Sequence, residues 1–271
     1  MLKTANIFLK CLYSEERKPF ERHIHHAYEV VFIKEGTVKF IIGERSYTAS
    51  ANSLLFIGKS EEHCVQLISN VYRRIYILLT PDQLNVLLPE FKLKSVFINR
   101  PENFCHHFDM NACGSETEAF FDALWREYQQ PNSYSKEKIE AIFRLLIIHC
   151  YRLHREQFPI PTKTVKQEIL DMQQYIDMNF AENIRLSDLE NRFFLSSSHL
   201  AHEFKKWTGH SPKNYMMHNR LAYAKELLVT TELSIGNIAS KAGFTDLSNF
   251  IRIFRMKTGK TPGKYRDSTG E

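Results

Sequence analysis

Residues 208–215 read TGHSPKNY and residues 258–265 read TGKTPGKY, so nearly the same eight-residue phrase recurs after 50 residues. When the region is aligned with itself at this offset, apolar residues meet apolar residues. In the helix that precedes the turn of each copy, the offset becomes 49. The pairs include Leu200 with Phe250, Phe204 with Phe254 and, at offset 49, Leu189 with Ile238. A repeat of this kind predicts two copies of one helical unit.

Each copy reads as a helix, a tight turn and a second helix. In the second copy, SIGNIASKAGF (residues 234–244) has apolar residues at helical spacing and ends at Gly243, a residue type suited to the end of a helix. TDLSNFIRIFRMKTG (residues 245–259) then offers Thr245 or Asp246 as an N-cap and closes at Gly259. This order of elements predicts a helix-turn-helix.

The second helix of each copy has one apolar face and one polar face. At 100° per residue, the polar face carries a hydroxyl, a hydrogen-bond donor able to reach base edges, and a cation. These residues are Ser198, His202 and Lys205 in the first copy and Ser248, Arg252 and Arg255 in the second. A solvated helix would also have a polar face. The same three kinds of residue, however, recur at equivalent positions in both copies. This recurrence favours a helix that lies in the major groove of DNA, with Lys205 and Arg255 at phosphates.

Charge is spread unevenly along the chain. The net charge is +5, yet residues 200–266 hold twelve Lys and Arg against four Asp and Glu, an excess of eight positive charges. Such a basic segment is typical of proteins that bind a polyanionic partner. The alternative is a basic face that is only solvated. The stretch between the copies begins with Ser211 as an N-cap and Pro212. It predicts a rod of roughly 27 Å, the scale of the ~34 Å between successive major grooves.

Residues 234–266 closely resemble the signature of the AraC/XylS family of bacterial transcription regulators. The matching positions are Gly243-Phe244, Ser248, Phe250, Phe254, Gly259, Thr261-Pro262 and Tyr265-Arg266. The resemblance covers about residues 168–267 and implies two recognition helices in adjacent major grooves. It implies base contacts from Ser198, Ala201 and His202, and from Ser248, Ile251 and Arg252. The first copy departs from the pattern: Glu190 stands where a small Ala is usual, and Phe194 stands where a Gly is usual. We therefore expect the second copy to be nearer the family's form.

The N-terminal hundred residues predict short strands. YEVVFIKEGTVKFIIGERSYTASANSLLFIG (residues 28–58) alternates β-branched and aromatic runs with turn signals, which is typical of a small antiparallel barrel or sandwich. From about residue 115 the pattern becomes helical, opening with a capping box of Ser115 and Glu118. A wide apolar stripe between Ile139 and Leu153 either packs on the barrel or seals a dimer.

The segment RHIHHAYE (residues 22–29) places His23, His25 and Glu29 as in the first motif of cupins, with His63 as a later candidate. In cupins these positions bind a divalent metal, whereas the cupin-like domain of AraC-type regulators holds a small effector. The second cupin motif is poorly matched here. We therefore assign His23, His25, Glu29 and His63 to an effector pocket, and we assign the chain neither a metal nor a cofactor.

The sequence thus predicts a multi-domain protein that is not an enzyme. An N-terminal all-β cupin-like barrel with a helical dimerisation segment (1–154) is joined by a linker (155–167), or by a surface loop, to an all-α double helix-turn-helix domain (168–271). We expect a small-molecule effector, for which a sugar is one candidate, double-stranded promoter DNA, a homodimer and, as a candidate partner, RNA polymerase. We expect the protein to activate transcription. Five cysteines without CxxC spacing, no signal peptide and no apolar membrane span predict a cytoplasmic location.

Two rival functions stay open at this point. The first is a cupin metalloenzyme with an accessory DNA-binding tail. The second is a constitutive dimeric DNA-binding protein in which the barrel only dimerises.

Overall fold

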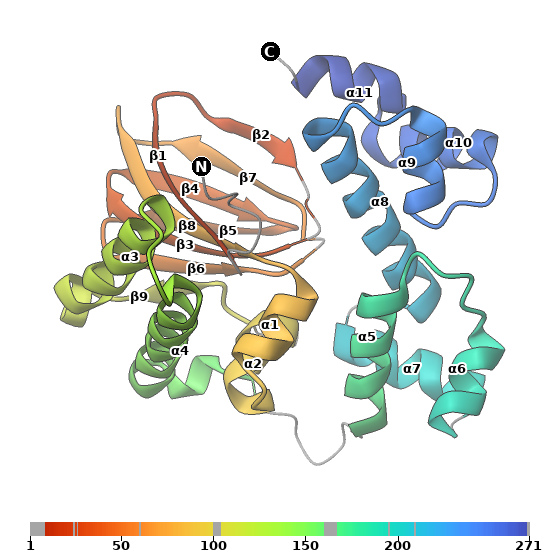
Figure 1. Ribbon diagram of the computed structural model, residues 1–271, viewed down its shortest axis with the longest axis horizontal. Coiled ribbons are helices and arrows are strands. Elements are labelled where there is room, and N and C mark those ends of the chain that lie inside the picture. The colour runs from red at the N-terminus through yellow and green to blue at the C-terminus, as the bar shows by residue number, and fades with distance from the viewer. Residues whose placement is uncertain are drawn as a thin grey trace. The chain divides into compact units, whose positions relative to one another are not determined.

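The computed structural model describes residues 9–269, apart from residues 24, 26, 60, 100–103, 160–166, 195 and 209. Contacts divide the chain into two compact units, and the division along the chain falls between Ile160 and Pro161. One unit combines strands and helices and the other is entirely helical in its described residues (Figure 1). No helix in the described ranges is both long and apolar enough to cross a membrane.

The N-terminal unit contains two antiparallel sheets, which confirms the predicted all-β core. The first sheet has the order β1 (Lys10–Glu16), β8 (Tyr72–Leu79), β3 (Tyr28–Glu35), β6 (Ser53–Ile57) and β9 (His107–Asp109). The second has the order β2 (Phe20–His23), β7 (His63–Leu67), β4 (Thr37–Ile42) and β5 (Arg45–Ser50).

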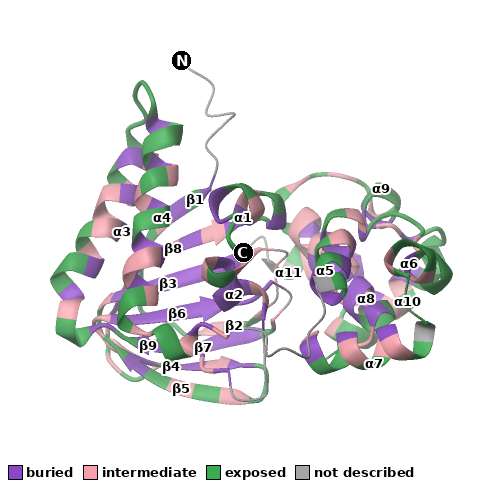
Figure 2. Cartoon of the chain, turned by 90° about the horizontal axis from the view of Figure 1, so that it is seen from below, coloured by how far each residue is buried: buried purple, intermediate pink, exposed green. Residues whose placement is uncertain are grey.

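The first sheet is buried on both faces because successive side chains on a strand point to opposite sides. On β3, Val31 and Ile33 belong to the core shared with Phe40 of β4, whereas Val30 and Phe32 belong to the core formed with the helices. All four β3 residues are fully buried, and the purple strands in Figure 2 show this burial along the sheets. Alternation therefore decides which residues face the interior between the sheets.

Helices pack on the outer face of the five-stranded sheet. They are α1 (Pro81–Leu87), α2 (Phe91–Ile98), α3 (Gly114–Gln129) and α4 (Ser135–Leu153), with 3-10 turns at Asn111–Cys113 and Arg155–Gln157. Phe121 of α3 stacks on Phe32 of β3 with ring centroids 5.0 Å apart. The prediction of strands throughout the first hundred residues was wrong for α1 and α2. The predicted capping box was also wrong, because the 3-10 turn leads directly into Gly114 and leaves Ser115 inside α3.

The apolar stripe on α4 serves mainly the core of its own domain. Ile139, Phe143, Leu146, Ile147 and Cys150 are fully buried there. Leu145 remains 54% exposed and Leu153 42% exposed. Packing on the sheet therefore explains most of the stripe. Leu145 and Leu153 are not covered by this packing and remain exposed.

The predicted linker (155–167) begins with a packed segment. Phe158 is buried against Phe108 and Tyr151 of the N-terminal core, with T-shaped ring contacts. Residues 160–166 lie outside the described residues, and α5 begins at Gln167. The domain limits 1–154 and 168–271 stay predictions.

The C-terminal unit consists of α5 (Gln167–Asn179), α6 (Leu186–Phe193), α7 (Ser197–Thr208), α8 (Pro212–Thr230), α9 (Ile235–Lys241), α10 (Leu247–Thr258) and α11 (Pro262–Thr269). The helix pairs α6–α7 and α9–α10 are the two predicted helix-turn-helix units. The long helix α8 joins them, and its N-cap Ser211 accepts a hydrogen bond from the Asn214 N–H at 3.4 Å. The all-α double helix-turn-helix is thus confirmed.

The repeated phrase makes equivalent contacts in both copies. The hydroxyls of Thr208 and Thr258 each donate to the carbonyl four residues earlier, at 2.8 Å. Each hydroxyl also accepts the N–H two residues later, at 3.2 and 3.3 Å. Tyr215 packs edge-on against Phe204, and Tyr265 packs edge-on against Phe254. The phrase therefore ends each recognition helix and anchors the start of the next helix to it.

The turns of the two units differ. Gly243 follows α9 with φ +83°, and a Cβ at this position would lie 2.4 Å from the carbonyl oxygen of Ala181. The equivalent residue after α6, Phe194, also takes a left-handed conformation (φ 54°), but its side chain is 92% exposed. Glu190, at the position of the buried Ala239, is only half-buried. The first unit therefore keeps its helix pair in spite of both departures, at the cost of backbone strain at Phe194.

Two arginines fasten α8 to its neighbours within this unit. Arg220 on α8 donates to the carbonyl oxygens of Phe180 and Glu182, both at 2.7 Å. Arg266 on α11 donates to the carbonyl oxygens of Leu228 at 3.3 Å and Leu233 at 2.6 Å. These bonds reach the carbonyl of Leu228 in the last turn of α8, that of Phe180 directly after α5, and those of Glu182 and Leu233 in the connections that follow. Carbonyls at the C-terminal end of a helix have no partner within their own helix.

Candidate nucleic-acid interface and sensor site

The second recognition helix, α10, is held by a firm apolar anchor and a firm cap. Phe250 and Phe254 are fully buried, in a cluster with residues of α8 and α9. The N-cap Asp246 accepts from the Asn249 N–H at 2.5 Å. The buried phenylalanines and the N-cap together fix the orientation of α10. The face of α10 opposite Phe250 and Phe254 therefore points outward in a defined direction.

That outward face carries the predicted residues together. Ser248, Arg252 and Arg255 are exposed, and Ile251 is half-buried. Arg252 donates to the side-chain oxygen of Asn249 at 2.9 Å, which holds the guanidinium along the helix surface. All four predicted residues line one shallow surface hollow.

The same hollow includes three residues that sequence reasoning missed. Met256, Gly259 and Thr261 complete its lining. Gly259 and Thr261 belong to the repeated phrase, so the signal that marks the end of the recognition helix also marks the edge of this surface. Met256 is 64% exposed, in the last full turn of α10.

The first recognition helix, α7, is anchored in an equivalent way. Leu200 and Phe204 are fully buried and Trp207 is 6% exposed. The Trp207 indole N–H donates to Gln173 on α5 at 2.8 Å, and the Gln173 amide donates to the Tyr215 hydroxyl on α8 at 3.1 Å. This buried chain ties α5, α7 and α8 together.

The outward face of α7 shows the predicted set. Ser198, His202 and Lys205 are exposed, and Ala201 is half-buried. His202 has a contact of 3.8 Å to its neighbour Glu203, a long distance for an ion pair at the surface. The structure therefore presents each predicted triplet on one side of its helix.

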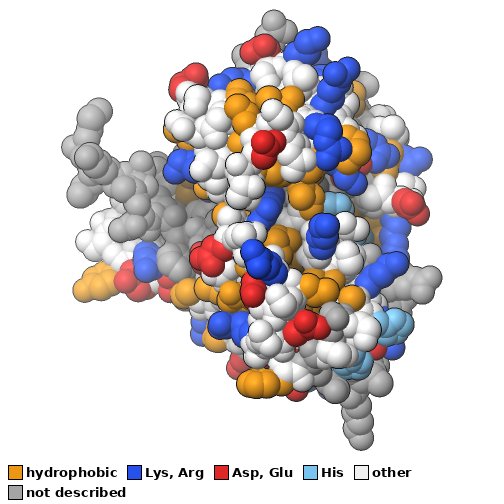
Figure 3. Space-filling model, turned by 90° about the vertical axis from the view of Figure 1, so that its right-hand side faces the viewer, with side chains coloured by type: hydrophobic (Ala, Val, Ile, Leu, Met, Phe, Trp, Pro, Cys, Tyr) orange, Lys and Arg blue, Asp and Glu red, His pale blue; other side chains and the backbone are white. Residues whose placement is uncertain are grey.

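The basic segment at the C-terminus is not uniformly available to a partner. Arg252, Arg255, Lys257, Lys260 and Lys264 are exposed, and Lys and Arg side chains spread over the face drawn in Figure 3. Arg266 is instead half-buried and donates to backbone carbonyls. We therefore count Arg266 as a structural residue, although it lies in the basic segment 200–266.

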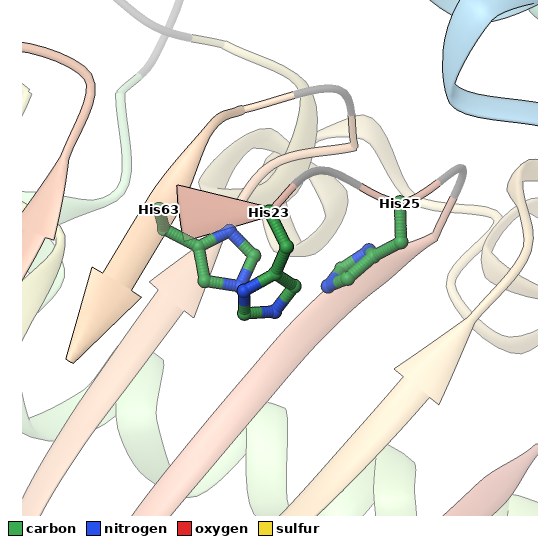
Figure 4. Close-up of side chains that lie close together, drawn as sticks. All are labelled: His23, His25 and His63. Atoms are coloured by element: carbon green, nitrogen blue, oxygen red, sulfur yellow. The ribbon is translucent and has the colours of Figure 1, made fainter. Parts of the chain in front are cut away.

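In the N-terminal domain, the predicted effector residues His23, Glu29 and His63 lie near the interior between the sheets. Glu29 shares the parity of Val31 on β3, and His63 shares that of Val65 on β7, so both face the interior. They are 3% and 2% exposed. His63 is the cross-strand neighbour of His23 on β2, and their ring centroids are 4.2 Å apart (Figure 4). His25 follows on the β2–β3 connection and is half-buried.

His63 is held on both sides. Its Nδ1 lies 2.9 Å from the Glu61 carbonyl oxygen, and its Nε2 lies 3.3 Å from Glu29 Oε2. Burial lowers the pKa of His63, but the hydrogen bond and negative charge of Glu29 outweigh burial and raise it above its usual value. A carboxylate in such an interior is stable only when it is paired, and His63 supplies part of that pairing.

Arg74 on β8 is a member of this polar group that sequence reasoning missed. Its Nη1 lies 3.7 Å from Glu29 Oε1, on the carboxylate oxygen not shared with His63. The guanidinium also lies over the rings of Phe20 and Tyr76, 4.5 and 4.4 Å from their centroids. The parity of β8 places Arg74 on the same face as the core residue Tyr72, which is the signal that would have identified it.

Comparisons with known proteins agree with both halves of this arrangement. The model of the AraC-like ligand binding domain matches residues 12–147, and that of a helix-turn-helix domain matches residues 189–268. The uncharacterized HTH-type transcriptional regulator YdiP of Escherichia coli strain K12 is 26% identical over 252 residues, which cover 90% of this chain and 80% of that protein. The HTH-type transcriptional activator RhaS of Enterobacter sp. strain 638 is 23% identical, over 91% of this chain and 87% of RhaS.

Solved structures show the same fold. ToxT from Vibrio cholerae superposes with a TM-score of 0.66 at 15% identity, covering 95% of this chain and 97% of ToxT. A structure of ToxT with a bound unsaturated fatty acid gives a TM-score of 0.63 at 16% identity, covering 95% of this chain and 94% of ToxT.

Proposed function

Because the chain belongs to the AraC family of helix-turn-helix transcriptional regulators, we propose that it binds promoter DNA sequence-specifically and that a small molecule at its ligand-binding domain controls this binding. The observation that carries the DNA part is the pair of recognition helices, α7 and α10. Their exposed faces hold the same kinds of side chain at positions 50 residues apart. A regulator that must reach DNA acts in the cytoplasm, where we place this chain.

The proposed contacts follow from the chemistry of the exposed faces. Ser198 and His202 on α7, and Ser248 and Arg252 on α10, would donate to base edges in two major grooves. Ala201 and Ile251 are apolar and suit contact with thymine methyl groups. Lys205 and Arg255 lie one helical turn further along and suit phosphates, which give affinity but no sequence information.

Replacement of Arg252 by alanine tests this assignment. Loss of one base contact is expected to cost about 1–3 kcal/mol and to relax sequence preference at one operator position. Arg255→Ala is expected to weaken binding on all sequences and to reduce the salt dependence by about one phosphate contact. Operator selection from a random DNA library, followed by fluorescence anisotropy at several salt concentrations, measures both effects.

The control is Lys39→Ala, which removes an exposed cation from β4 of the N-terminal domain. It is expected to leave affinity, specificity and salt slope unchanged. If Arg252→Ala binds the selected operator at full strength with unrelaxed preference, the assignment of α10 as a base-reading helix is wrong.

We further propose that His23, His25, Glu29 and His63 contact the effector. A buried carboxylate beside histidines and Arg74 offers both donors and acceptors to a polar ligand. A sugar fits this chemistry, and the fatty acid seen in ToxT indicates that a carboxylate-bearing ligand also merits testing. Thermal stabilisation of the chain by a panel of sugars and fatty acids, lost in His25→Ala, would identify the class.

Activation and dimerisation complete the proposal. RhaS carries the name of an activator, and activation in this family member would involve contact with RNA polymerase. The exposed Leu145 and Leu153 on α4 supply apolar surface for a homodimer. An in vitro transcription assay with and without the purified chain decides the sign of regulation.

A further inference from the structure

Basic side chains gather in the C-terminal unit where both recognition helices end. They are His210 directly after α7, His218 and Lys225 on α8, and Lys257 in the last turn of α10. The ring centroids of His210 and His218 lie 4.6 Å apart, and one ring meets the other edge-on. His218 is half-buried, whereas His210 and Lys257 are exposed. The group therefore combines a partly shielded imidazole with two accessible basic side chains.

The repeated phrase holds His210 in place. The Thr208 hydroxyl accepts the His210 N–H at 3.2 Å and donates to the Phe204 carbonyl of α7 at 2.8 Å. The residue equivalent to His210 in the second copy is Lys260, which is also basic and exposed. Each copy of the phrase thus places a basic side chain just beyond its recognition helix.

Lys257 stands where the first copy has a buried apolar residue. Its counterpart 50 residues earlier is Trp207, which is 6% exposed and donates to Gln173 of α5. Lys257 follows Phe254 by three residues and Phe250 by seven, so it shares the side of α10 that packs with α8. The second copy therefore carries a positive charge, close to α8, at a position that the first copy uses for packing.

The charged groups that act on His218 all have the same sign. Burial, together with the positive charges of His210, Lys257 and Lys225, lowers the pKa of His218 to about 4. Among the described residues, no carboxylate forms an ion pair with His218 or Lys257. Asp177 of α5 instead accepts a hydrogen bond from Asn219, the residue after His218 on α8. An anion that enters the group would therefore offset a repulsion that the folded chain leaves uncompensated.

The backbone of bound DNA can supply this anion. Between two successive major grooves, the phosphates that border the intervening minor groove face the protein. A phosphate accepts charge-assisted hydrogen bonds from imidazole N–H groups and from an ammonium group. A negative charge beside His218 also favours its protonated form.

We propose that His210, His218 and Lys257 together hold one DNA phosphate between the two recognition helices, and that a proton is taken up at His218 when DNA binds. The proposal rests on the proposed function as a DNA-binding regulator. It adds a third point of contact, on α8 and the helix ends beside it, to the two base-reading faces. The contact gives affinity and fixes the position of the DNA, but it carries no sequence information.

The first test compares DNA affinity at several salt concentrations and between pH 7.5 and pH 5, with the full chain and the selected operator. Lys257→Gln should lower the slope of log affinity against log salt by about one phosphate contact, with base preference unchanged. Uptake of one proton raises the affinity of the unchanged chain by at most about tenfold per pH unit as the pH falls. His218→Gln should remove this part of the pH dependence. His202 remains in every variant, so the difference between variants isolates His218.

Lys39→Gln is the matched control, because it removes an exposed ammonium group from the N-terminal domain. It should keep the salt slope and the pH dependence of the unchanged chain. A second test uses operators in which one phosphate at a time, between the two half-sites, is replaced by a neutral methylphosphonate. One such position should weaken binding by the unchanged chain and leave binding by Lys257→Gln unaffected.

Two outcomes overturn the proposal. One is that Lys257→Gln and His218→Gln both keep the salt slope and the pH dependence of the unchanged chain. The other is that no methylphosphonate position distinguishes Lys257→Gln from the unchanged chain. If the unchanged chain selects no operator at all, the proposed function is refuted and the phosphate contact with it.

Discussion

Replacement of Gly243 by alanine should destabilise the second helix-turn-helix far more than the same change at Gly259. Both glycines have positive φ values, +83° and +75°. A side chain in this conformation destabilises the folded state by about 1–2 kcal/mol. Alanine also reduces the conformational entropy of the unfolded chain, which offsets about 0.4–1 kcal/mol of this loss. The backbone effect alone therefore predicts a loss of about 0.5–1 kcal/mol at each site.

The two positions differ in what a Cβ would meet. At Gly259 no atom lies within 4 Å, so the backbone effect is the whole cost. At Gly243 a Cβ would lie 2.4 Å from the Ala181 carbonyl oxygen and 2.7 Å from its Cα. These are backbone atoms that cannot swing aside, and overpacking of this kind adds about 1–3 kcal/mol. The total expected loss for Gly243→Ala is about 1.5–4 kcal/mol.

Amide hydrogen exchange measured by mass spectrometry on the full chain resolves this difference locally. Peptides that cover α9 and α10 should lose about 1.5–4 kcal/mol of protection in Gly243→Ala and about 0.5–1 kcal/mol in Gly259→Ala. Peptides from the N-terminal sheets serve as the internal reference. If the two variants lose equal protection in α9 and α10, the close approach to Ala181 does not stabilise this unit and the reasoning fails.

Three further predictions concern other positions. Phe194→Gly should stabilise the first unit by about 0.5–1 kcal/mol, because it relieves a left-handed residue whose side chain is exposed; a loss of exchange protection in α6 and α7 would contradict this. Burial, with the nearby charges of His210, Lys257 and Lys225, lowers the pKa of His218 to about 4. The unfolded chain therefore binds the proton first, and about 1–2 kcal/mol of stability is lost as the pH falls from 6.5 to 4. His218→Gln should flatten urea-unfolding stability across that range, and an unchanged slope would refute the assignment. Leu145→Arg on α4 should weaken the proposed homodimer at least tenfold in analytical ultracentrifugation, and an unchanged dimer would place the interface elsewhere.

The double helix-turn-helix could be predicted because its signals are local and occur twice. Glycine at the end of α9, the Asp246 cap and the Ser211-Pro212 start each act within a few residues, and the structure contains them as expected. The use of Arg266 could not be predicted, since its partners Leu228 and Leu233 are more than thirty residues away. Local charge counting could only include it in the basic segment 200–266.

The N-terminal domain was harder to predict for two reasons. Helices α1 and α2 have only seven and eight residues, too few for helical periodicity to stand out against neighbouring strands. The polar group around Glu29 depends on which strands lie opposite each other, and a bulge in β2 between Phe20 and His23 reverses the facing of His23 that alternation alone would give. Sequence spacing could nominate the histidines, but only the sheet register shows that His23 and His63 are neighbours.

The hydrogen bonds that Arg220 and Arg266 donate to backbone carbonyls make helix α8 a rigid spacer between the two helix-turn-helix units. One guanidinium fixes the connection after α5 to the rod, and the other fixes α11 to the end of the rod. The distance between the two recognition helices is then set by the length of α8, about 28 Å for its nineteen residues. Because a helix does not stretch easily, this distance is nearly fixed. An operator with half a helical turn of DNA inserted between its two half-sites should engage only one recognition helix at a time, whatever the quality of each half-site.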